Sequence, residues 1–218
     1  AIVKIRKDMP LDRAALIGCA AITGYGAVTR TSNVRPGDTV AVIGCGGIGL
    51  CAVNGAAIAG AGRIIAIDRV ASKLQLAKLF GATDCIDAND DDVVARVIAL
   101  TAGGVQHSFE AIGHKQTAEQ SFQMLRRGGS ANIIGMIAPG VKLELQGRDF
   151  LGEKRIQGSL MGSNQFPVDM PRLVDFYMNG KLRLDELISQ RIPLAQVNAG
   201  LDELRRGELA RSVIVFEQ

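Results

Sequence analysis

Short runs of β-branched residues alternate along this chain with segments of helical spacing, and the runs are bounded by Gly, Asp or Asn. The pattern predicts six strands, at Thr39–Ile43, Arg63–Ile67, Thr83–Ile86, His107–Ala111, Ser130–Ile137 and Arg155–Leu160. The helices predicted between them are Gly47–Ala59, Ala71–Phe80, Asp91–Thr101 and Thr117–Arg127. Near-continuous apolar strands joined by helical crossovers are typical of parallel sheets covered on both faces. We therefore expect an α/β fold with a doubly wound, six-stranded parallel sheet.

The two ends of the chain do not follow this alternation. The first 38 residues predict a short strand and then a helix from about Leu11 to Arg30, followed by the turn Val34–Asp38. The C-terminal region predicts two helices and a closing strand, at Pro167–Asn179, Leu194–Arg206 and Ser212–Phe216. We divide the chain into an entering segment, a sheet domain and a C-terminal segment, at residues 1–32, 33–165 and 166–218.

Composition excludes several classes of protein. The net charge is +3, and the 25 basic residues are scattered among 22 acidic ones, which argues against a nucleic-acid partner. No apolar run reaches the roughly 18 to 20 residues that span a bilayer, and the start has no signal-peptide pattern. We expect a soluble, cytoplasmic protein whose four cysteines are buried free thiols. The acidic run Asn89–Asp92 is more typical of a helix cap than of a metal site.

The most informative stretch is the glycine-rich sequence TVAVIGCGGIGLCAV, which follows one predicted strand and opens a helix. Gly44 permits a tight turn, Gly46 leaves room for a pyrophosphate, and Gly49 lets the helix pack closely on the strand. The helix N-terminus attracts the negative charge. A purely structural glycine turn is the alternative. The context favours the loop of a Rossmann dinucleotide-binding domain, with Gly47 and Ile48 completing it.

An acidic residue supports that interpretation. Asp68 closes the next predicted strand, 19 residues after Gly49, where a carboxylate can accept hydrogen bonds from the adenosine ribose. A 2′-phosphate would meet this negative charge, so the sequence favours NAD over NADP. The adjacent Arg69 would soften the repulsion and weakens the argument.

The chain also resembles the zinc-dependent medium-chain alcohol dehydrogenases over nearly its whole length. The motifs that carry the resemblance are GCAAITGYGA, the glycine loop, RIIAIDRVASKLQLAKLFGAT, FEAIG, GGSANIIGM and ARSVIVF. Within the family it looks most similar to glutathione- or mycothiol-linked formaldehyde dehydrogenases and aryl-alcohol dehydrogenases. The resemblance implies hydride transfer between NAD and a small alcohol or aldehyde.

The resemblance also implies site residues. Cys19 matches a thiolate ligand of the catalytic zinc, and Thr23 matches a catalytic position facing the nicotinamide. Lys73 matches a ribose contact, and Arg211 matches a basic residue that reaches the pyrophosphate. The remaining matches line the cofactor or bind its carboxamide, and they are Ile112, His114, Ile134, Met136, Ser159 and Met161. His114 departs from the arginine common in liver-type members, which puts its contact in doubt.

The zinc ligands are incomplete in this sequence. Catalytic zinc takes three protein ligands, and the family draws the others from an upstream domain with a Gly-His-Glu motif that is absent here. We expect the chain to begin after that catalytic domain and to be inactive alone, with Cys19 as a buried thiol without metal. The segments Ile2–Ile5 and Val213–Phe216 would then lack an apolar partner.

The resemblance also implies an oligomeric state, and two alternative functions remain to be weighed against it. The strand Arg155–Met161 matches one that pairs across a two-fold axis, which implies a homodimer or homotetramer. One alternative function is a zinc-free quinone or enoyl reductase, although Cys19 argues against it. Another is a stand-alone NAD-binding module.

Overall fold

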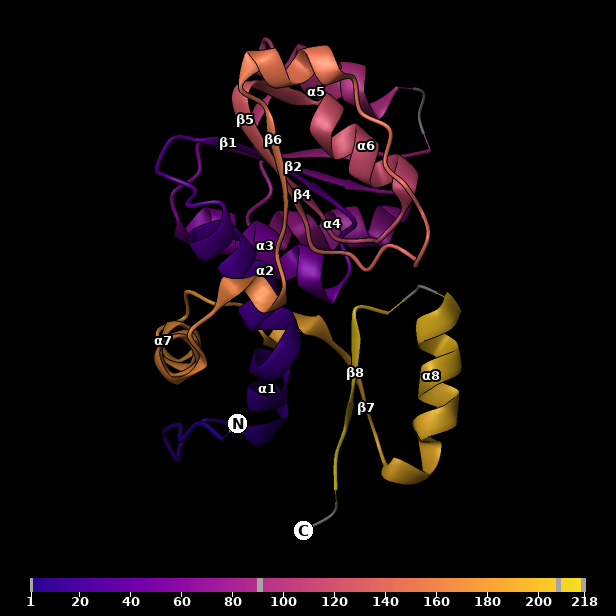
Figure 1. Cartoon of the computed structure of the whole chain (residues 1–218). Coiled ribbons are helices and arrows are strands. Elements are labelled where there is room, and N and C mark those ends of the chain that lie inside the picture. The colour runs from indigo at the N-terminus through magenta and orange to yellow at the C-terminus, as the bar shows by residue number, and fades with distance from the viewer. Residues whose placement is uncertain (1, 90–91, 207–208, 217–218) are drawn as a thin grey trace.

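The computed structural model describes residues 2–89, 92–206 and 209–216. Its centre is a six-stranded parallel sheet in the order β3-β2-β1-β4-β5-β6 (Figure 1). This order is that of the Rossmann fold and confirms the predicted class. The strands are β1 (Thr39–Ile43), β2 (Arg63–Asp68), β3 (Asp84–Asp87), β4 (Val105–Glu110), β5 (Leu125–Ile133) and β6 (Arg155–Gly158).

Two apolar cores lie on opposite faces of the sheet. In β1, Val40 and Val42 join the core that contains α3 (Gly47–Ile58) and α4 (Ala71–Leu79). The alternate residues Ala41 and Ile43 join the core that contains α5 (Val93–Thr101) and α6 (Lys115–Gln123). Successive strand residues point to opposite faces. Both faces are covered, which explains why the sequence of β1 has no polar side.

Several element boundaries differ from the predicted ones. The fifth strand, expected at Ser130–Ile137, begins at Leu125 because that residue pairs with Val105, so the preceding helix ends before Arg127. The strand ends at Ile133 because the next two backbone N–H groups both donate to the Glu110 carbonyl. The sixth strand, expected to reach Leu160, ends at Gly158, just before a left-handed turn.

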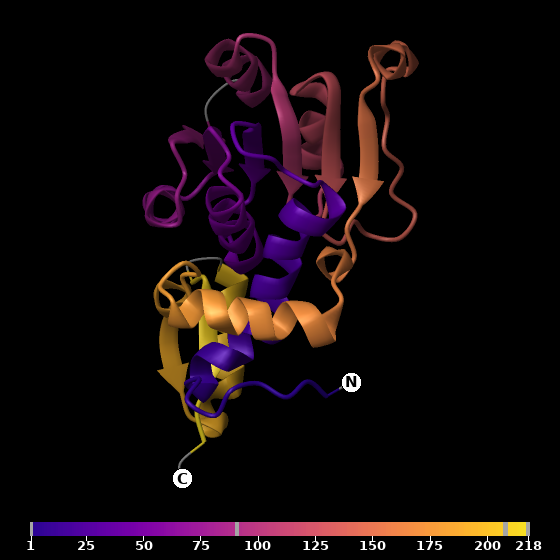
Figure 2. The same ribbon diagram turned by 90° about the vertical axis from the view of Figure 1, so that its left-hand side faces the viewer.

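The entering segment contains one long helical stretch instead of a strand and a helix. Residues 2–5 form no strand, and the Ile2 side chain is 99% exposed. Ile5 is half-buried and packs against the larger core, so the expectation that Ile2–Ile5 lacks an apolar partner was wrong for Ile5. The helical stretch comprises α1 (Leu11–Leu16), η1 (Ile17–Ala21), α2 (Ile22–Gly26) and η2 (Ala27–Thr31), of which η1 and η2 are π-helical turns. In Figure 2 it runs from the lower part of the molecule up to the sheet.

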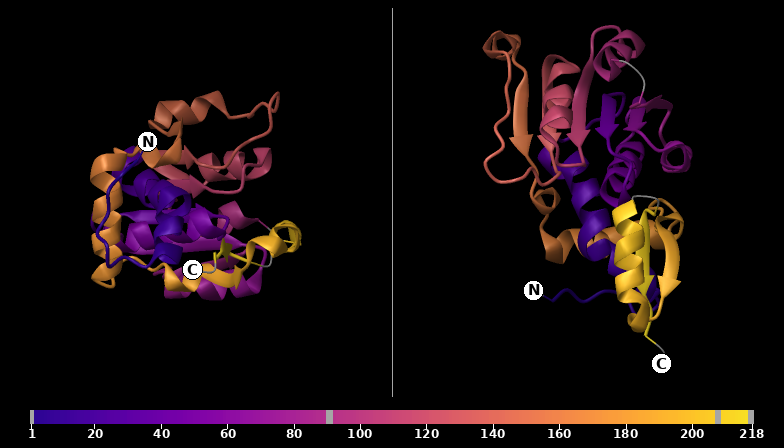
Figure 3. Two further views of the ribbon diagram at one scale, coloured as in Figure 1. Left: turned by 90° about the horizontal axis from the view of Figure 1, so that it is seen from below. Right: turned by 90° about the vertical axis from the view of Figure 1, so that its right-hand side faces the viewer.

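The C-terminal segment contains one more strand than predicted. Its main elements are α7 (Phe166–Met178), β7 (Ile188–Ile192), α8 (Val197–Arg206) and β8 (Arg211–Ile214). β7 has the sequence ISQRI, which is too polar to predict a strand, and it is formed by parallel pairing with β8. The two strands and α8 stand beside each other below the sheet (Figure 3).

The chain's two ends pack together. Arg13 forms an ion pair with Asp185 at 2.7 Å, and Arg191 forms one with Asp12 at 2.8 Å. Val213 is buried in the larger core, so the expectation that it lacks an apolar partner was wrong, because β8 packs against α1. Phe216 is 67% exposed, as expected. The division at residues 32 and 165 stays a prediction.

The predicted helix cap lies at the start of α5. The Asp92 carboxylate accepts a hydrogen bond from the Ala95 N–H at 2.9 Å, which confirms the capping prediction for that residue. Asp90 and Asp91, including the predicted helix start, lie outside the described residues. No helix within the described ranges is both long and apolar enough to cross a membrane.

Candidate functional site

The glycine loop joins β1 to the N-terminus of α3. Gly44 has a φ of +93°, a left-handed conformation that favours glycine, and its N–H donates to the Ile67 carbonyl at 2.8 Å. A Cβ on Gly49 would lie 1.7 Å from the Gly44 carbonyl oxygen, so only glycine lets α3 start this close to the strand. A Cβ on Gly46 would meet nothing within 4 Å, which leaves open space at the helix N-terminus. Such space beside free helical N–H groups suits a phosphate.

Asp68 lies next to this loop at the end of β2. Its Oδ2 atom accepts a hydrogen bond from the Cys45 N–H at 2.7 Å, and Oδ1 accepts one from the Val70 N–H at 2.9 Å. The side chain is half-buried. The Asp68 carboxylate is therefore fixed in orientation, and each of its oxygens can still accept a hydrogen bond from a further donor.

Cations approach the loop from two elements. A Cβ on Gly47 would lie 2.7 Å from the Arg211 guanidinium carbon, so β8 brings this cation against the start of α3. Burial raises the pKa of the Cys45 thiol, and the positive charge of Lys73 on α4 opposes that rise. The structure thus brings Asp68 and Arg211 to one glycine loop, and the charge of Lys73 acts on the Cys45 thiol in that loop.

The loop after β4 lies beside the glycine turn after β1, at the point in the sheet where the strand order changes direction. A Cβ on Gly44 would lie 2.5 Å from the Ile112 side chain, so Ile112 covers the glycine turn. The Glu110 carboxylate holds this loop. Its Oε1 accepts hydrogen bonds from the N–H groups of Ile112 and Gly113 and from the Thr117 hydroxyl, at 2.8 to 2.9 Å.

Thr23 and Met161 form a second group of predicted residues. Thr23 is buried on α2, and its hydroxyl lies 3.8 Å from the Met161 sulfur. Met161 opens the left-handed turn η4 (Met161–Ser163). The buried Ser159 hydroxyl lies 2.7 Å from that of Thr31 at the end of η2. The helical stretch that carries Cys19 and Thr23 is thus joined to the segment after β6.

Four of the predicted cofactor-binding residues are exposed, namely Arg69, Ile112, His114 and Met136. Ile134 is half-buried against the core. Exposure leaves the side chains of these four residues able to contact a bound molecule.

Cys19 is exposed and Cys85 is half-buried, so the expectation of a buried thiol was wrong for these two residues, whereas Cys45 and Cys51 are buried as expected. Within η1 the residues Ile17 and Ala20 are buried, whereas Gly18 and Cys19 are exposed. Cys51, in contrast, is fully buried, and burial raises the pKa of its thiol to about 12. Among the described residues no group of three His, Cys, Asp or Glu side chains could hold a metal ion. Cys19 does not form a zinc site with these residues alone.

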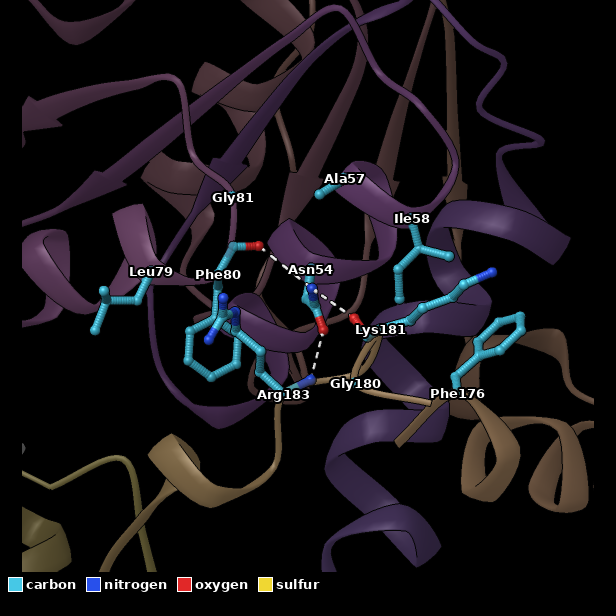
Figure 4. Close-up of a pocket in the computed structure, with 10 residues that line it drawn as sticks. All are labelled: Asn54, Ala57, Ile58, Leu79, Phe80, Gly81, Phe176, Gly180, Lys181 and Arg183. Carbon is cyan, nitrogen blue, oxygen red and sulfur yellow. Dashed lines mark hydrogen bonds between the residues drawn. The ribbon is translucent and has the colours of Figure 1, made fainter. Parts of the chain in front are cut away.

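A separate cavity of about 520 Å³ lies behind α3, away from the glycine loop (Figure 4). It is bounded by the ends of α3 and α4 and by the turn at Gly180–Arg183. At its base, Asn54 donates to the carbonyls of Phe80 and Lys181 and accepts from the Arg183 N–H. All polar atoms of the Asn54 amide form hydrogen bonds within the protein. These bonds connect α3 to the end of α4 and to the turn at Gly180–Arg183, so the cavity lies where the sheet domain contacts the C-terminal segment.

Sequence reasoning missed two supporting residues. Glu110 is a fully buried carboxylate and the last residue of β4, and an acid within the predicted strand His107–Ala111 was the available signal. Asn164 joins the turn η4 to α2. Its sequence context is that of an ordinary loop, so no signal identified it.

Comparison with known proteins reveals similarity over the whole chain. Residues 47–178 match the profile of the zinc-binding dehydrogenases. The chain is 40% identical over 215 residues to the probable S-(hydroxymethyl)glutathione dehydrogenase 1 of Schizosaccharomyces pombe, covering 98% of this chain and 57% of the relative. It is 37% identical to alcohol dehydrogenase class-3 of Caenorhabditis elegans, covering 100% of this chain and 58% of the relative.

A similar solved structure is the benzyl alcohol dehydrogenase of Acinetobacter calcoaceticus, with a TM-score of 0.95 at 32% identity. The match covers 99% of this chain and 59% of that protein. The chain thus spans somewhat more than half the length of the relatives that it matches. Together with the profile match, these similarities confirm the predicted family: the chain belongs to the zinc-binding dehydrogenases.

Proposed function

We propose that this chain is the NAD-binding part of a zinc-dependent alcohol dehydrogenase. The observation that carries the proposal is the position of Asp68, whose carboxylate is fixed 2.7 Å from the Cys45 N–H beside the open space at Gly46. A carboxylate there accepts hydrogen bonds from ribose hydroxyls and repels a 2′-phosphate. These features favour NAD over NADP.

The chain's own residues bind and orient the dinucleotide. The N-terminus of α3 and the Arg211 guanidinium stabilise the pyrophosphate, while Lys73 contacts the adenosine ribose. Ile112, His114, Ile134 and Met136 line the crevice, and Thr23, Ser159 and Met161 hold the nicotinamide end. When bound, NAD accepts or delivers the hydride.

The reaction class comes from the relatives. Those compared above are named as dehydrogenases of alcohols or of S-(hydroxymethyl)glutathione, so we propose an alcohol or aldehyde as substrate. Zinc in such an enzyme polarises the substrate oxygen. Cys19 supplies one thiolate, and the other ligands come from residues outside those described here. A cysteine at this position of the IGC motif favours this role over a zinc-free reductase, and its exposure leaves the thiol accessible to a metal ion.

A dimer through β6 is part of the proposal. β6 is an edge of the sheet, and an open edge presents unpaired backbone groups to a second copy.

Titration with NADH and NADPH, followed by the fluorescence of the bound nucleotide, tests the cofactor assignment. We expect the unaltered chain to bind NADH, and Asp68→Asn to weaken NADH binding about tenfold. The variant should also prefer NADH over NADPH less strongly, because loss of the carboxylate charge removes its repulsion of the 2′-phosphate. Lys78→Gln, on the same helix as Lys73, serves as a control for non-specific charge effects. Tighter binding of NADPH than of NADH to the unaltered chain would refute the assignment.

A further inference from the structure

Three consecutive residues after β6 have left-handed backbone conformations. The φ angles of Met161, Gly162 and Ser163 are 49°, 68° and 52°. L-residues with side chains rarely adopt such angles, because the Cβ atom crowds the backbone. Two of these residues are not glycine, so contacts with the surrounding structure must hold the turn in place.

The Asn164 side chain provides such contacts. Its Nδ2 donates to the carbonyl of Ile22 at 2.6 Å and to that of Met161 at 2.5 Å, so both amide hydrogens are used. Its Oδ1 is buried and has no hydrogen-bond partner among the described residues. Rotating the amide by 180° would place this oxygen against two carbonyls. The donors of Asn164 are therefore what the site requires.

The turn also rests directly on the backbone of α2. A Cβ on Gly162 would lie 2.7 Å from the carbonyl oxygens of Ile22 and Thr23, and one on Gly26 would lie 2.4 Å from the Gly162 carbonyl. On another side of α2, a Cβ on Gly24 would lie 2.4 Å from the Ile48 carbonyl of α3. Gly24 and Gly26 therefore let α2 pack closely against α3 on one side and against the Met161–Ser163 turn on the other.

A second link holds the turn at its other side. The Thr31 hydroxyl lies 2.7 Å from that of Ser159 and 2.9 Å from that of Ser163. Together with Asn164, this link fixes the turn to the helical stretch at both Ile22 and Thr31. Thr23 and Met161, 3.8 Å apart, lie between these two links.

We propose that Asn164 is a positioning residue for the nicotinamide half of the cofactor. It joins the Met161–Ser163 turn to the backbone beside Thr23, and so it sets the spacing of the two groups that hold that end of the dinucleotide. The inference rests on the proposed function. Asp68 and the glycine loop have their own hydrogen bonds, to Cys45, Val70 and Ile67, so the adenosine half does not depend on Asn164.

The test compares two ligands on the same chain. ADP-ribose contains the adenosine half and the pyrophosphate of NADH but lacks the nicotinamide. We expect Asn164→Ala and the isosteric Asn164→Asp to weaken NADH binding about tenfold, measured by calorimetry, while ADP-ribose binding changes by less than about twofold. The emission maximum of bound NADH, which reports on the nicotinamide surroundings, should also shift toward that of free NADH.

Gln165→Ala is the matched control, because the neighbouring Gln165 is exposed and its described hydrogen bonds all involve its backbone N–H and carbonyl groups. Retained ADP-ribose binding shows that each variant is folded. Equal losses for both ligands, or unchanged NADH binding in both Asn164 variants, would overturn the inference. So would equal affinity of the unaltered chain for the two ligands. If the unaltered chain bound neither ligand, the proposed function itself would fail.

Discussion

At the scale of single residues, three glycines of one short loop have different physical tasks. Gly44 supplies a left-handed turn, Gly46 leaves space, and Gly49 permits contact between helix and strand. The last task is the most demanding, because a side chain at Gly49 would meet a backbone carbonyl, which cannot rotate away.

Gly49→Ala should therefore destabilise the chain by about 3 kcal/mol, since the added methyl group forces α3 away from the strand. Gly18→Ala is the control, because a Cβ there meets nothing within 4 Å in a helical segment. It should stabilise the chain by about 0.5 kcal/mol through the better helix propensity of alanine. Urea unfolding followed by circular dichroism measures both. A cost for Gly49→Ala below about 1 kcal/mol would contradict the packing argument.

At the scale of elements, polar contacts join the long helical stretch to the sheet. His107 on β4 lies 2.7 Å from the Ser32 hydroxyl at the end of η2 and 3.1 Å from Asp38 before β1. Burial lowers the pKa of His107, while the hydrogen bond with Asp38 opposes that shift. The histidine is therefore held in its neutral form near neutral pH.

This arrangement predicts a pH dependence of stability. Because the pKa of His107 is lower in the folded chain than the 6.5 of an unperturbed histidine, the unfolded chain binds more protons between the two values. Stability from this group is complete above about pH 6.5 and is lost as the pH falls through the folded pKa. His107→Gln should flatten the decrease of the melting temperature between pH 7.5 and 5.5. An unchanged decrease in the variant would show that other groups cause it.

At the scale of the whole molecule, the sheet ends at an uncovered strand. Ser159 donates to the Ile133 carbonyl on the β5 side, and N–H groups alternate in direction along a strand, so the Gly158 N–H points outward. An outward row of donors and acceptors suits pairing with the same strand of a second copy.

Gly158→Pro removes this outward N–H and should shift a dimer toward monomer in sedimentation velocity experiments. Gly158→Ala keeps the N–H, and its Cβ would meet nothing within 4 Å, so this control should dimerise like the unaltered chain. If both variants and the unaltered chain sediment identically as dimers, the interface lies elsewhere.

Sequence alone determined the features of this protein that depend only on residues close together in the chain. The repeat of apolar strands and helices predicted the sheet, and the glycine spacing with Asp68 predicted the cofactor loop, because turns and periodicity are local properties. The family resemblance added Cys19 and Thr23, although the contacts of these residues stay predictions.

Tertiary structure decided what depends on residues far apart in the chain. β7 is a strand because it pairs with β8, and Val213 is buried because α1 lies beside it. Glu110 becomes a loop support, and Asn164 links residues 22 and 161, only when distant segments meet. A side chain's hydrogen-bond partners are set by the packing of whole elements, and no local pattern in the sequence records them.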